Sequence, residues 1–329
     1  MRTYIVFSVT ALTLFLTSCG KSKSDNDVVS QRYIHKYGYA VSKDEFEGRQ
    51  YPGQVITLLK NGVTITSAYE NGVLHGPCTH TFPHSQTVES YYVYNQGNMV
   101  KEVLYDLTGM PVREDVQLSP TRYATTLWYA SGTPMCTEEY AGEELLEGQY
   151  FTLTNDLEAQ IVKGKGERIR RDREGVLLHK DQVDEGYVTL HETFYPSCAP
   201  ESIAYYHQGK LHGEKKTFTA TGEPLAVKEY VGGLLHGKST LYKNGTRYLE
   251  THYLDGMKNG LEIHYIDGET ISQEILWEND KRHGPALYYV EGVAQTEYYY
   301  DGTLVNEERW NELHQLDELA NQISPAVRR

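Results

Sequence analysis

A repeat of 23 or 24 residues constrains the fold of this chain more than any other feature of its sequence. Four short segments ending in glycine recur at steps of 24, 23 and 24 residues, at Gly213, Gly237, Gly260 and Gly284. A second glycine follows each of them after eight or nine residues, at Gly222, Gly245, Gly268 and Gly292. Repetition at a fixed period is typical of arrays in which each unit packs against its neighbours. We therefore predict tandem units.

The same spacing continues toward the N-terminus with weaker agreement. Gly76 belongs to the first series of glycines, and turn-forming residues recur at similar steps after it. The spacing is least regular between Lys163 and Pro200, where Glu174-Gly175 and Glu185-Gly186 still mark candidate turns. We count roughly ten or eleven units and place the array at residues 48–305.

Each unit has the pattern of a β-hairpin. Asn244-Gly245 and Asp267-Gly268 are pairs that favour a type I′ turn, because both central residues of that turn have positive φ. Leu261, Ile263 and Tyr265 alternate with polar residues before the second pair, as in a half-buried strand. Both series of glycines are thus predicted to form repeat turns, with the first series linking one unit to the next. The predicted fold is all-β: an elongated, single-layer antiparallel β-meander of hairpin repeats.

The last segment, residues 306–329, has a different pattern. Trp310, Leu313, Leu316 and Leu319 recur every three residues, which is typical of one face of a helix. We predict a short C-terminal capping helix and tail, with the helix packing on the last strands and covering their open edge.

Tyrosine is unusually common, with 28 residues against 7 phenylalanines. It suits half-buried pleated surfaces, where the ring packs and the hydroxyl stays hydrated. Aromatic residues also keep the period of the repeat. The candidate binding-face residues are Tyr242, Tyr253, Tyr265, Trp277, Tyr289 and Tyr300.

The repeat unit resembles a known family. Gly233-Leu-Leu-His236-Gly237, followed by Tyr242-Lys-Asn244-Gly245 and Tyr253, is similar to the MORN-repeat variant of bacterial proteins. The resemblance covers about residues 48–305 and is strongest from 209 to 302. It implies an antiparallel single-layer β array used for binding. Some members of the family are antitoxins that neutralise a partner toxin in the cytoplasm.

The N-terminus has the pattern of an export signal. A basic start at Met1-Arg2 is followed by an apolar run from Ile5 to Leu16 and small residues before Cys19. Leu16-Thr17-Ser18-Cys19 resembles the bacterial lipobox, which implies cleavage before Cys19 and attachment of diacylglycerol and an N-acyl group to that residue. We predict a signal peptide at 1–18 and a lipidated Cys19 with a flexible tether at 19–47. Because Gly20 rather than Asp follows the cysteine, we favour the outer membrane, on its periplasmic or its outer side.

Charge narrows the choice of partners. The net charge is −14 at pH 7, and such a field repels nucleic acid. The expected partners are the membrane, through the lipid anchor, and a protein or an envelope polymer. Neither nucleic acid nor a small-molecule substrate is predicted.

The residues that could form a catalytic or metal site fit structural roles better. His75, His212, His236 and His283 precede repeat glycines, but equivalent positions in neighbouring units lie about two strand spacings apart, too far to share a metal ion. Cys78, Cys136 and Cys198 form no CxxC motif, which favours buried or free thiols over intermolecular disulfides. The basic run Lys163–Arg173 fits a solvated strand face better than an anion site. No catalytic motif is recognised, so we predict no enzyme activity, no metal, and no cofactor beyond the acyl groups on Cys19.

These observations lead to one main expectation and two alternatives. The main expectation is a membrane-anchored lipoprotein whose repeat array is an interaction or scaffold surface in the cell envelope. The first alternative is an antitoxin-like inhibitor of a partner toxin, which would act in the cytoplasm. The second, which we favour least, is an envelope enzyme or a metal-binding protein.

Overall fold

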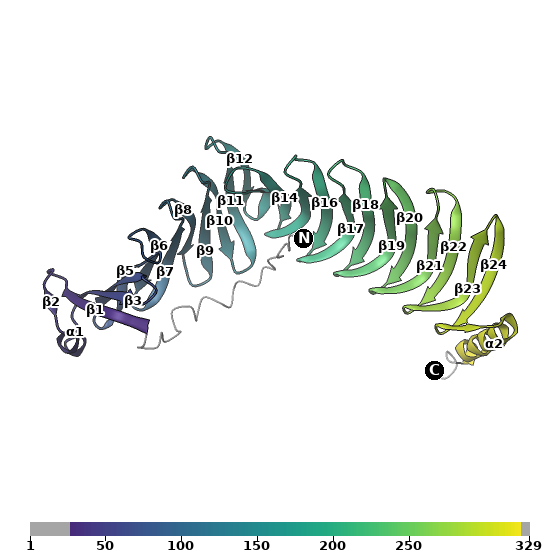
Figure 1. The fold of residues 1–329 in the computed structure, drawn as a ribbon, viewed down its shortest axis with the longest axis horizontal. Helices are drawn as coiled ribbons and strands as arrows, with labels where there is room; N and C mark the ends of the chain where they lie inside the picture. The colour runs from purple at the N-terminus through teal and green to yellow at the C-terminus, as the bar shows by residue number, and fades with distance from the viewer. Residues whose placement is uncertain (1–26, 324–329) are drawn as a thin grey trace. The chain divides into compact units, whose positions relative to one another are not determined.

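The computed structural model describes residues 27–323, of which most lie in β-strands (Figure 1). The predicted signal peptide and the lipidated Cys19 lie outside the described residues. The strands pair in one antiparallel sheet of 25 strands, which confirms the predicted all-β meander. Contacts divide the chain into two units, which are described separately below.

The first unit ends at Gly166 and also includes Asp172–Gly175. Its elements are β1 (Val28–His35), β2 (Ala40–Val41), α1 (Lys43–Gly48), β3 (Gly53–Leu59), β4 (Thr64–Glu70), β5 (Val73–Thr81), β6 (Val88–Asn95), β7 (Asn98–Tyr105), β8 (Pro111–Gln117), β9 (Arg122–Trp128), β10 (Pro134–Ala141), β11 (Glu144–Phe151) and β12 (Leu157–Val162). Strand β13 (Lys165–Arg171) begins in this unit and ends in the next.

The second unit comprises Glu167–Arg171 and the chain from Val176 onward. Its remaining elements are β14 (Leu177–Asp184), β15 (Tyr187–Phe194), β16 (Pro200–His207), β17 (Lys210–Phe218), β18 (Pro224–Val231), β19 (Leu234–Lys243), β20 (Thr246–Leu254), β21 (Met257–Tyr265), β22 (Ile271–Glu278), β23 (Lys281–Val290), β24 (Val293–Tyr300), β25 (Thr303–Val305) and α2 (Glu307–Ile323).

From β3 to β13, and again from β14 to β25, each strand pairs with the next one along the chain. Two kinds of turn join most of them. One is a two-residue turn with positive φ at both positions, as at Asn244 (52°) and Gly245 (73°), which confirms the type I′ prediction there.

The other kind is a five-residue loop, and here the prediction for Asp267-Gly268 is wrong in detail. The loop between β21 and β22 is closed by the Ile266 N–H, which donates to the Thr270 carbonyl at 3.0 Å. The Asp267 carboxylate accepts from the backbone N–H groups of Glu269 and Thr270 at 3.1 and 2.7 Å. A side chain that satisfies the following backbone in this way favours a longer loop over the two-residue turn.

The first series of glycines also requires a correction. These residues lie inside strands β5, β17, β19, β21 and β23 rather than at turns, and their φ angles run from 92° to 108°; they are Gly76, Gly213, Gly237, Gly260 and Gly284. At Gly237, Lys228 pairs with Ser239 while Tyr230 pairs with Leu235, so β19 has two extra residues there. Such a bulge requires a backbone conformation that glycine adopts readily. The second series, Gly222, Gly245, Gly268 and Gly292, does lie in turns.

The flexible tether predicted for residues 19–47 is ordered from Val28 onward. Strand β1 pairs with both β2 and β3, and α1 begins after Ser42, whose hydroxyl accepts from the Glu45 N–H at 3.2 Å. Phe46 of α1 is buried, with its ring 5.5 Å from that of Tyr33. This apolar contact orders the segment, which its polar composition did not suggest.

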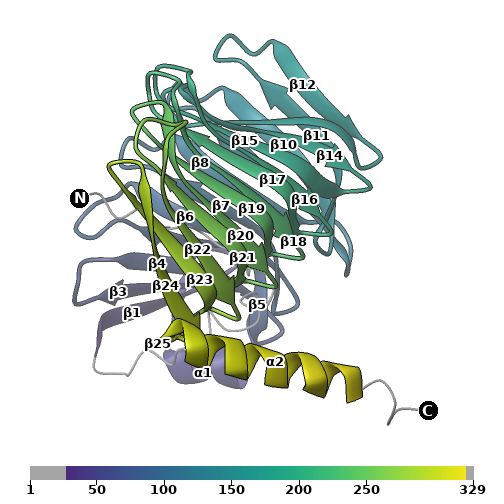
Figure 2. The ribbon, with the colours of Figure 1, turned by 90° about the vertical axis from the view of Figure 1, so that its right-hand side faces the viewer.

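The predicted C-terminal helix is confirmed, but only part of its predicted face is covered. Helix α2 lies against β24 (Figure 2), where Trp310 packs on Tyr298 with ring centroids 5.5 Å apart. The Tyr300 hydroxyl donates to the Asp317 carboxylate at 2.9 Å. Leu316 and Leu319 are 59% and 54% exposed, because the helix meets the strand through Trp310 and Asp317 instead. Neither helix of the described residues is both long and apolar enough to cross a bilayer.

A single line of directly paired residues, here called the central row, contains much of the buried core of each unit. In the first unit it runs through Tyr33, Val55, Ser67, Cys78, Tyr92, Glu102, Asp115, Thr125, Glu138, Gly148, Ile161 and Gly166. In the second it runs through Asp181, His191, Ala204, Lys215, Lys228, Ser239, Thr251, Glu262, Ile275, Ala286 and Glu297. Because side chains alternate along a strand, the row defines one face of the sheet. We call it the row face and the other the reverse face.

Candidate functional site

Four acidic residues of the central row are almost completely buried: Asp115, Glu138, Asp181 and Glu262. Burying a carboxylate is costly unless hydrogen bonds and opposite charges compensate it. Each of the four has such partners on the row face, and the chemistry of these partners differs from one acid to the next.

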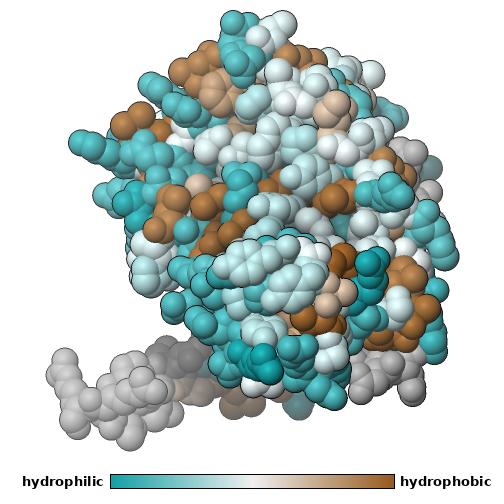
Figure 3. All heavy atoms as spheres, turned by 90° about the vertical axis from the view of Figure 1, so that its left-hand side faces the viewer, coloured by the Kyte–Doolittle hydropathy of each residue, from teal (hydrophilic) through white to brown (hydrophobic). Residues whose placement is uncertain are grey.

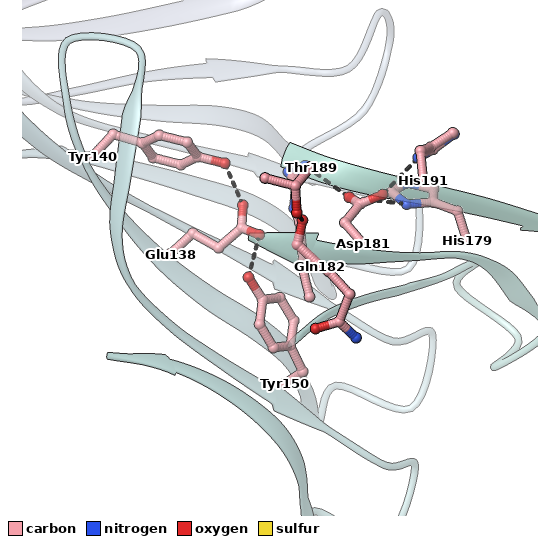
Figure 4. A network of polar contacts seen from close by, with 9 residues as sticks. Glu138, Tyr140, Tyr150, His179, Asp181, Gln182, Thr189 and His191 are labelled. Atoms are coloured by element: carbon pink, nitrogen blue, oxygen red, sulfur yellow. Dashed lines mark hydrogen bonds and ion pairs between the residues drawn. The ribbon is translucent and has the colours of Figure 1, made fainter. Parts of the chain in front are cut away.

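The two acids of the first unit have conventional partners. Asp115 accepts from the Arg113 guanidinium at 2.6 and 3.0 Å, and from the Thr125 hydroxyl at 2.6 Å. Glu138 accepts from the hydroxyls of Tyr140 and Tyr150 at 2.6 and 2.8 Å (Figure 4). These contacts compensate the burial of both carboxylates. We therefore assign both groups a structural role.

Glu262 in the second unit has a mixed set of partners. Its carboxylate lies 2.5 Å from the Lys258 Nζ and 3.1 Å from the His264 Nε2. The Thr251 hydroxyl donates to it at 3.0 Å. Burial alone would raise the pKa of this carboxyl, but the hydrogen bonds and charge of its neighbours outweigh it and lower the pKa below its usual value.

Asp181 is the only one of the four acids with two imidazoles as neighbours. Its Oδ1 lies 2.5 Å from the His191 Nδ1, and its Oδ2 lies 3.4 Å from both the His179 Nδ1 and the Arg168 Nη1. Burial opposes ionisation, but the two histidines and Arg168 hold the pKa of Asp181 well below its usual range. Figure 4 shows both imidazoles turned toward the carboxylate.

A β-bulge brings His191 opposite Asp181. Asp181 pairs with His191 and Gln182 with Leu190, but Val183 pairs with Val188, so Thr189 is the extra residue of β15. The Thr189 hydroxyl donates to the Gln182 carbonyl at 3.1 Å. If regular pairing continued from Val183 and Val188 with no bulge, His191 would lie opposite Lys180 and point to the reverse face.

This cluster was missed in the sequence. His179-Lys180-Asp181 has the period-two spacing of one strand face, and His191 follows the candidate turn Glu185-Gly186. That pattern is a usable signal, but it gives the wrong face for His191 unless the bulge is known. Within the described residues, these three side chains are the one group of three or more His, Cys, Asp or Glu residues whose ligating atoms lie within 4.8 Å of one another.

The basic run Lys163–Arg173 supplies partners for internal acids. Arg168 faces Asp181, and the Arg173 Nη2 lies 2.8 Å from the Asp106 carboxylate, both within their own units. Hydrogen bonds from Thr108 and Arg173 lower the pKa of Asp106. These two arginines therefore stabilise the fold.

Aromatic residues form a second line on the row face of the second unit, which we call the aromatic row. It contains Tyr206, Tyr230, Tyr253, Trp277 and Tyr299, one from every second strand and all half-buried. The last four lie directly opposite bulge glycines: Gly213, Gly237, Gly260 and Gly284. A glycine leaves room for the ring across the strand pair, and the ring covers the backbone that glycine exposes.

Basic side chains lie between the rings of this row. The Lys258 Nζ is 4.3 Å from the Trp277 ring centroid, and the Arg282 guanidinium is 5.1 Å from that of Tyr299. Burial raises the pKa of the Tyr230 hydroxyl, and electrostatic interaction with Tyr253 adds a smaller effect in the same direction. The surface therefore combines rings that make contact area with cations that attract acidic or aromatic groups.

The six aromatic residues predicted for the binding face do not share a face. Tyr253 and Trp277 belong to the aromatic row. Alternation along the strands places the other four, Tyr242, Tyr265, Tyr289 and Tyr300, on the reverse face. There the hydroxyls of Tyr265 and Tyr289 donate to Glu250 and Glu274 at 3.2 and 3.1 Å.

The remaining candidates from the sequence lie apart from these features. Three of the predicted histidines each lie near an acidic side chain, His75, His236 and His283, at 3.5, 3.3 and 3.7 Å. The ring of His212 is tilted against that of His207, with centroids 5.7 Å apart. Cys78 and Cys136 are buried, whereas Cys198 is exposed at a turn. The view of the first unit's end in Figure 3 shows hydrophobic side chains in several small patches among hydrophilic ones.

Comparison with known proteins does not identify a family. No protein-family model and no curated protein matches this chain. Among solved structures, the crystal structure of TcdB2-TccC3 without its hypervariable C-terminal region aligns over 84% of this chain and 19% of that chain, with 10% sequence identity and a TM-score of 0.19. At that TM-score the match carries no argument about fold or function.

Proposed function

We propose that this chain is a lipoprotein anchored through Cys19 in the cell envelope, in the outer membrane, and that its β-repeat array binds a protein partner there. It acts in this proposal by binding and not by catalysis. The observation that carries the binding claim is the aromatic row of the second unit. The anchor is inferred from the lipobox-like sequence that precedes Cys19.

The aromatic row has the properties of a binding surface. Tyr and Trp rings give a large contact area and lose little conformational entropy when they are immobilised. The row repeats the same side-chain class at every second strand, so a partner can meet several equivalent contacts at once. Lys258 and Arg282 beside the rings supply the polar groups that usually surround the contact centre of an interface.

Acyl labelling tests the anchor. Cells that express the full chain are grown with labelled palmitate, beside cells that express the Cys19→Ala variant. We expect label on the unsubstituted chain in the membrane fraction and none on the variant. Equal labelling of the two chains, or a chain that stays unlabelled in the cytosol, would remove the lipoprotein proposal. A cytosolic chain bound to a toxin would favour the antitoxin-like alternative.

Site-specific cross-linking tests the surface. A photoreactive residue is placed at Tyr253 on the row face or, as the matched control, at Tyr242 on the reverse face. We expect one discrete protein adduct from position 253 in envelope preparations and none from 242. With the adduct identified, Trp277→Ala should weaken binding by roughly 30-fold, as truncation of an interface anchor does, and Tyr289→Ala should leave it unchanged. Adducts from 242 alone would contradict the proposal.

A further inference from the structure

The cluster of His179, Asp181 and His191 has a chemistry that the proposed binding surface does not use. We propose that these three side chains form a binding site for a divalent transition-metal ion of the Zn²⁺ class. Two imidazole nitrogens and one carboxylate oxygen are a known ligand set for zinc, with the fourth position left for water. This inference does not depend on the aromatic row or on the lipid anchor.

The separation of the ligating atoms suits one ion after small side-chain movements. All three atoms lie within 4.8 Å of one another, and the His191 Nδ1, now 2.5 Å from the Asp181 Oδ1, has to move slightly away from it to let an ion in between. Zinc holds nitrogen at about 2.0–2.1 Å and carboxylate oxygen at about 2.0–2.2 Å, so two ligands of one tetrahedral ion lie roughly 3.3 Å apart. The His179 and His191 side chains are 27% and 30% exposed, so their rings have room to rotate toward that spacing.

The backbone holds the three residues on one face of two adjacent strands. His179 and Asp181 are two residues apart on β14, and His191 lies directly opposite Asp181 on β15. The Thr189 hydroxyl closes the bulge that sets this register. A triangle of side chains fixed by paired strands needs little ordering when a ligand binds.

One polar atom of the cluster supports this assignment. The Nδ1 of His179 is buried and makes no hydrogen bond within the described residues, although it lies 3.4 Å from the Asp181 Oδ2. A buried polar atom left unsatisfied costs free energy. An ion bound at this nitrogen would satisfy it.

The position of Arg168 favours one oxygen of the Asp181 carboxylate as the metal ligand. Its Nη1 lies 3.4 Å from Oδ2, which leaves Oδ1, on the His191 side, for the metal. The guanidinium also places a positive charge near the ion and so opposes binding. We therefore expect a weaker site than a closed zinc site with four protein ligands.

The other buried acids of the central row do not offer this ligand set. Asp115 is held by a guanidinium and a hydroxyl, Glu138 by two phenols, and Glu262 by an ammonium, a hydroxyl and a single imidazole. His264 beside Glu262 is consequently a matched control, because it is also a histidine next to a buried acid of the same row.

The test is titration of the metal-free, full-length chain with Co²⁺, followed by displacement with Zn²⁺. We expect saturable binding of one ion with visible absorption bands, and a rise in the thermal unfolding midpoint when Zn²⁺ is added. His179→Ala should raise the dissociation constant at least about 100-fold, because loss of a mere outer-shell partner already costs 10–100-fold. His264→Ala should bind like the unsubstituted chain.

The His179→Ala variant loses one of the neighbours that compensate the charge of Asp181, so its fold is checked before its metal binding is compared. Circular dichroism in metal-free buffer checks that it is folded, and His191→Ala provides a second ligand removal. The proposal is overturned if the unsubstituted chain shows no saturable Co²⁺ binding, if folded His179→Ala binds as tightly as it does, or if His264→Ala loses binding equally.

Discussion

At the scale of single residues, the central row depends on how each buried acid is compensated. Asp115, Glu138, Asp181 and Glu262 are each at most 8% exposed. Their partners lie either two to four residues away on the same strand or across a strand pair, on the same face of the sheet. Because each acid needs such partners, removal of one neighbour leaves part of the buried charge uncompensated and lowers the stability of the fold.

Gly148 shows how closely one of these acids is packed. It lies opposite Glu138, and a Cβ at this position would be 2.6 Å from the Tyr150 hydroxyl, which donates to Glu138. Tyr150 is 1% exposed and cannot move aside freely. We expect Gly148→Ala to reduce the free energy of unfolding by about 1–3 kcal/mol through overpacking, measured by urea denaturation.

The control for this prediction is Gly48→Ala at the end of α1, where a Cβ would meet nothing within 4 Å. It should leave the free energy of unfolding nearly unchanged. If the two substitutions had equal effects, the contact between Gly148 and Tyr150 would not be the cause.

Glu262 predicts a dependence of stability on pH. Its pKa is lower in the folded protein than usual. A carboxyl of this kind adds stability above its unfolded pKa, about 4.3, and that stability is lost as the pH falls below this value. We expect the difference in free energy of unfolding between the unsubstituted chain and Glu262→Gln to shrink from pH 5 to pH 3. Urea denaturation at each pH measures it, and a difference that stays constant would contradict the assignment.

At the scale of elements, the sequence predicts hairpins well and bulges poorly. The alternation of Leu261, Ile263 and Tyr265 and the Asn244-Gly245 turn follow from local rules of side-chain direction and φ. The bulges at Gly237 and Thr189 depend on cross-strand register, which the sequence does not display. A one-residue error in register moves a side chain to the other face. For this reason the aromatic residues were assigned to one face, and the His179–Asp181–His191 cluster was overlooked.

The bulge glycines carry a prediction of their own. Gly213 has φ of 96°, and a Cβ there would make only an ordinary contact, 3.5 Å from the Tyr205 Cβ. Its replacement by alanine should therefore cost about 1–2 kcal/mol of stability from backbone strain alone. Asparagine tolerates positive φ better, so Gly213→Asn should lower the thermal unfolding midpoint less than Gly213→Ala. The reverse order would show that the bulge glycine is needed for another reason.

At the scale of the whole molecule, the repeat places residues of similar chemistry in rows across the sheet, because each strand pairs with the next one along the chain. The period of 23 or 24 residues predicted the array, and the three-residue spacing of the apolar residues from Trp310 to Leu319 predicted the C-terminal helix. Neither pattern predicted the ordered segment from Val28, where the buried side chains of Tyr33, His35 and Phe46 outweigh a polar composition. The two features on which the proposals rest, the aromatic row and the imidazole pair at Asp181, both lie on the row face of the second unit.

The register of the sheet is the claim on which the rows depend, and a cross-strand disulfide tests it most directly. Ser239 and Thr251 are directly opposite on β19 and β20, whereas Glu250 points to the other face. Cysteines at opposite positions have Cα atoms within about 7 Å, close enough for a disulfide. The chain carrying Ser239→Cys and Thr251→Cys is oxidised mildly, beside a control carrying Ser239→Cys and Glu250→Cys, and the linked peptides are identified by mass spectrometry. We predict a 239–251 link and no 239–250 link; a link in the control alone would contradict the register and, with it, the central row.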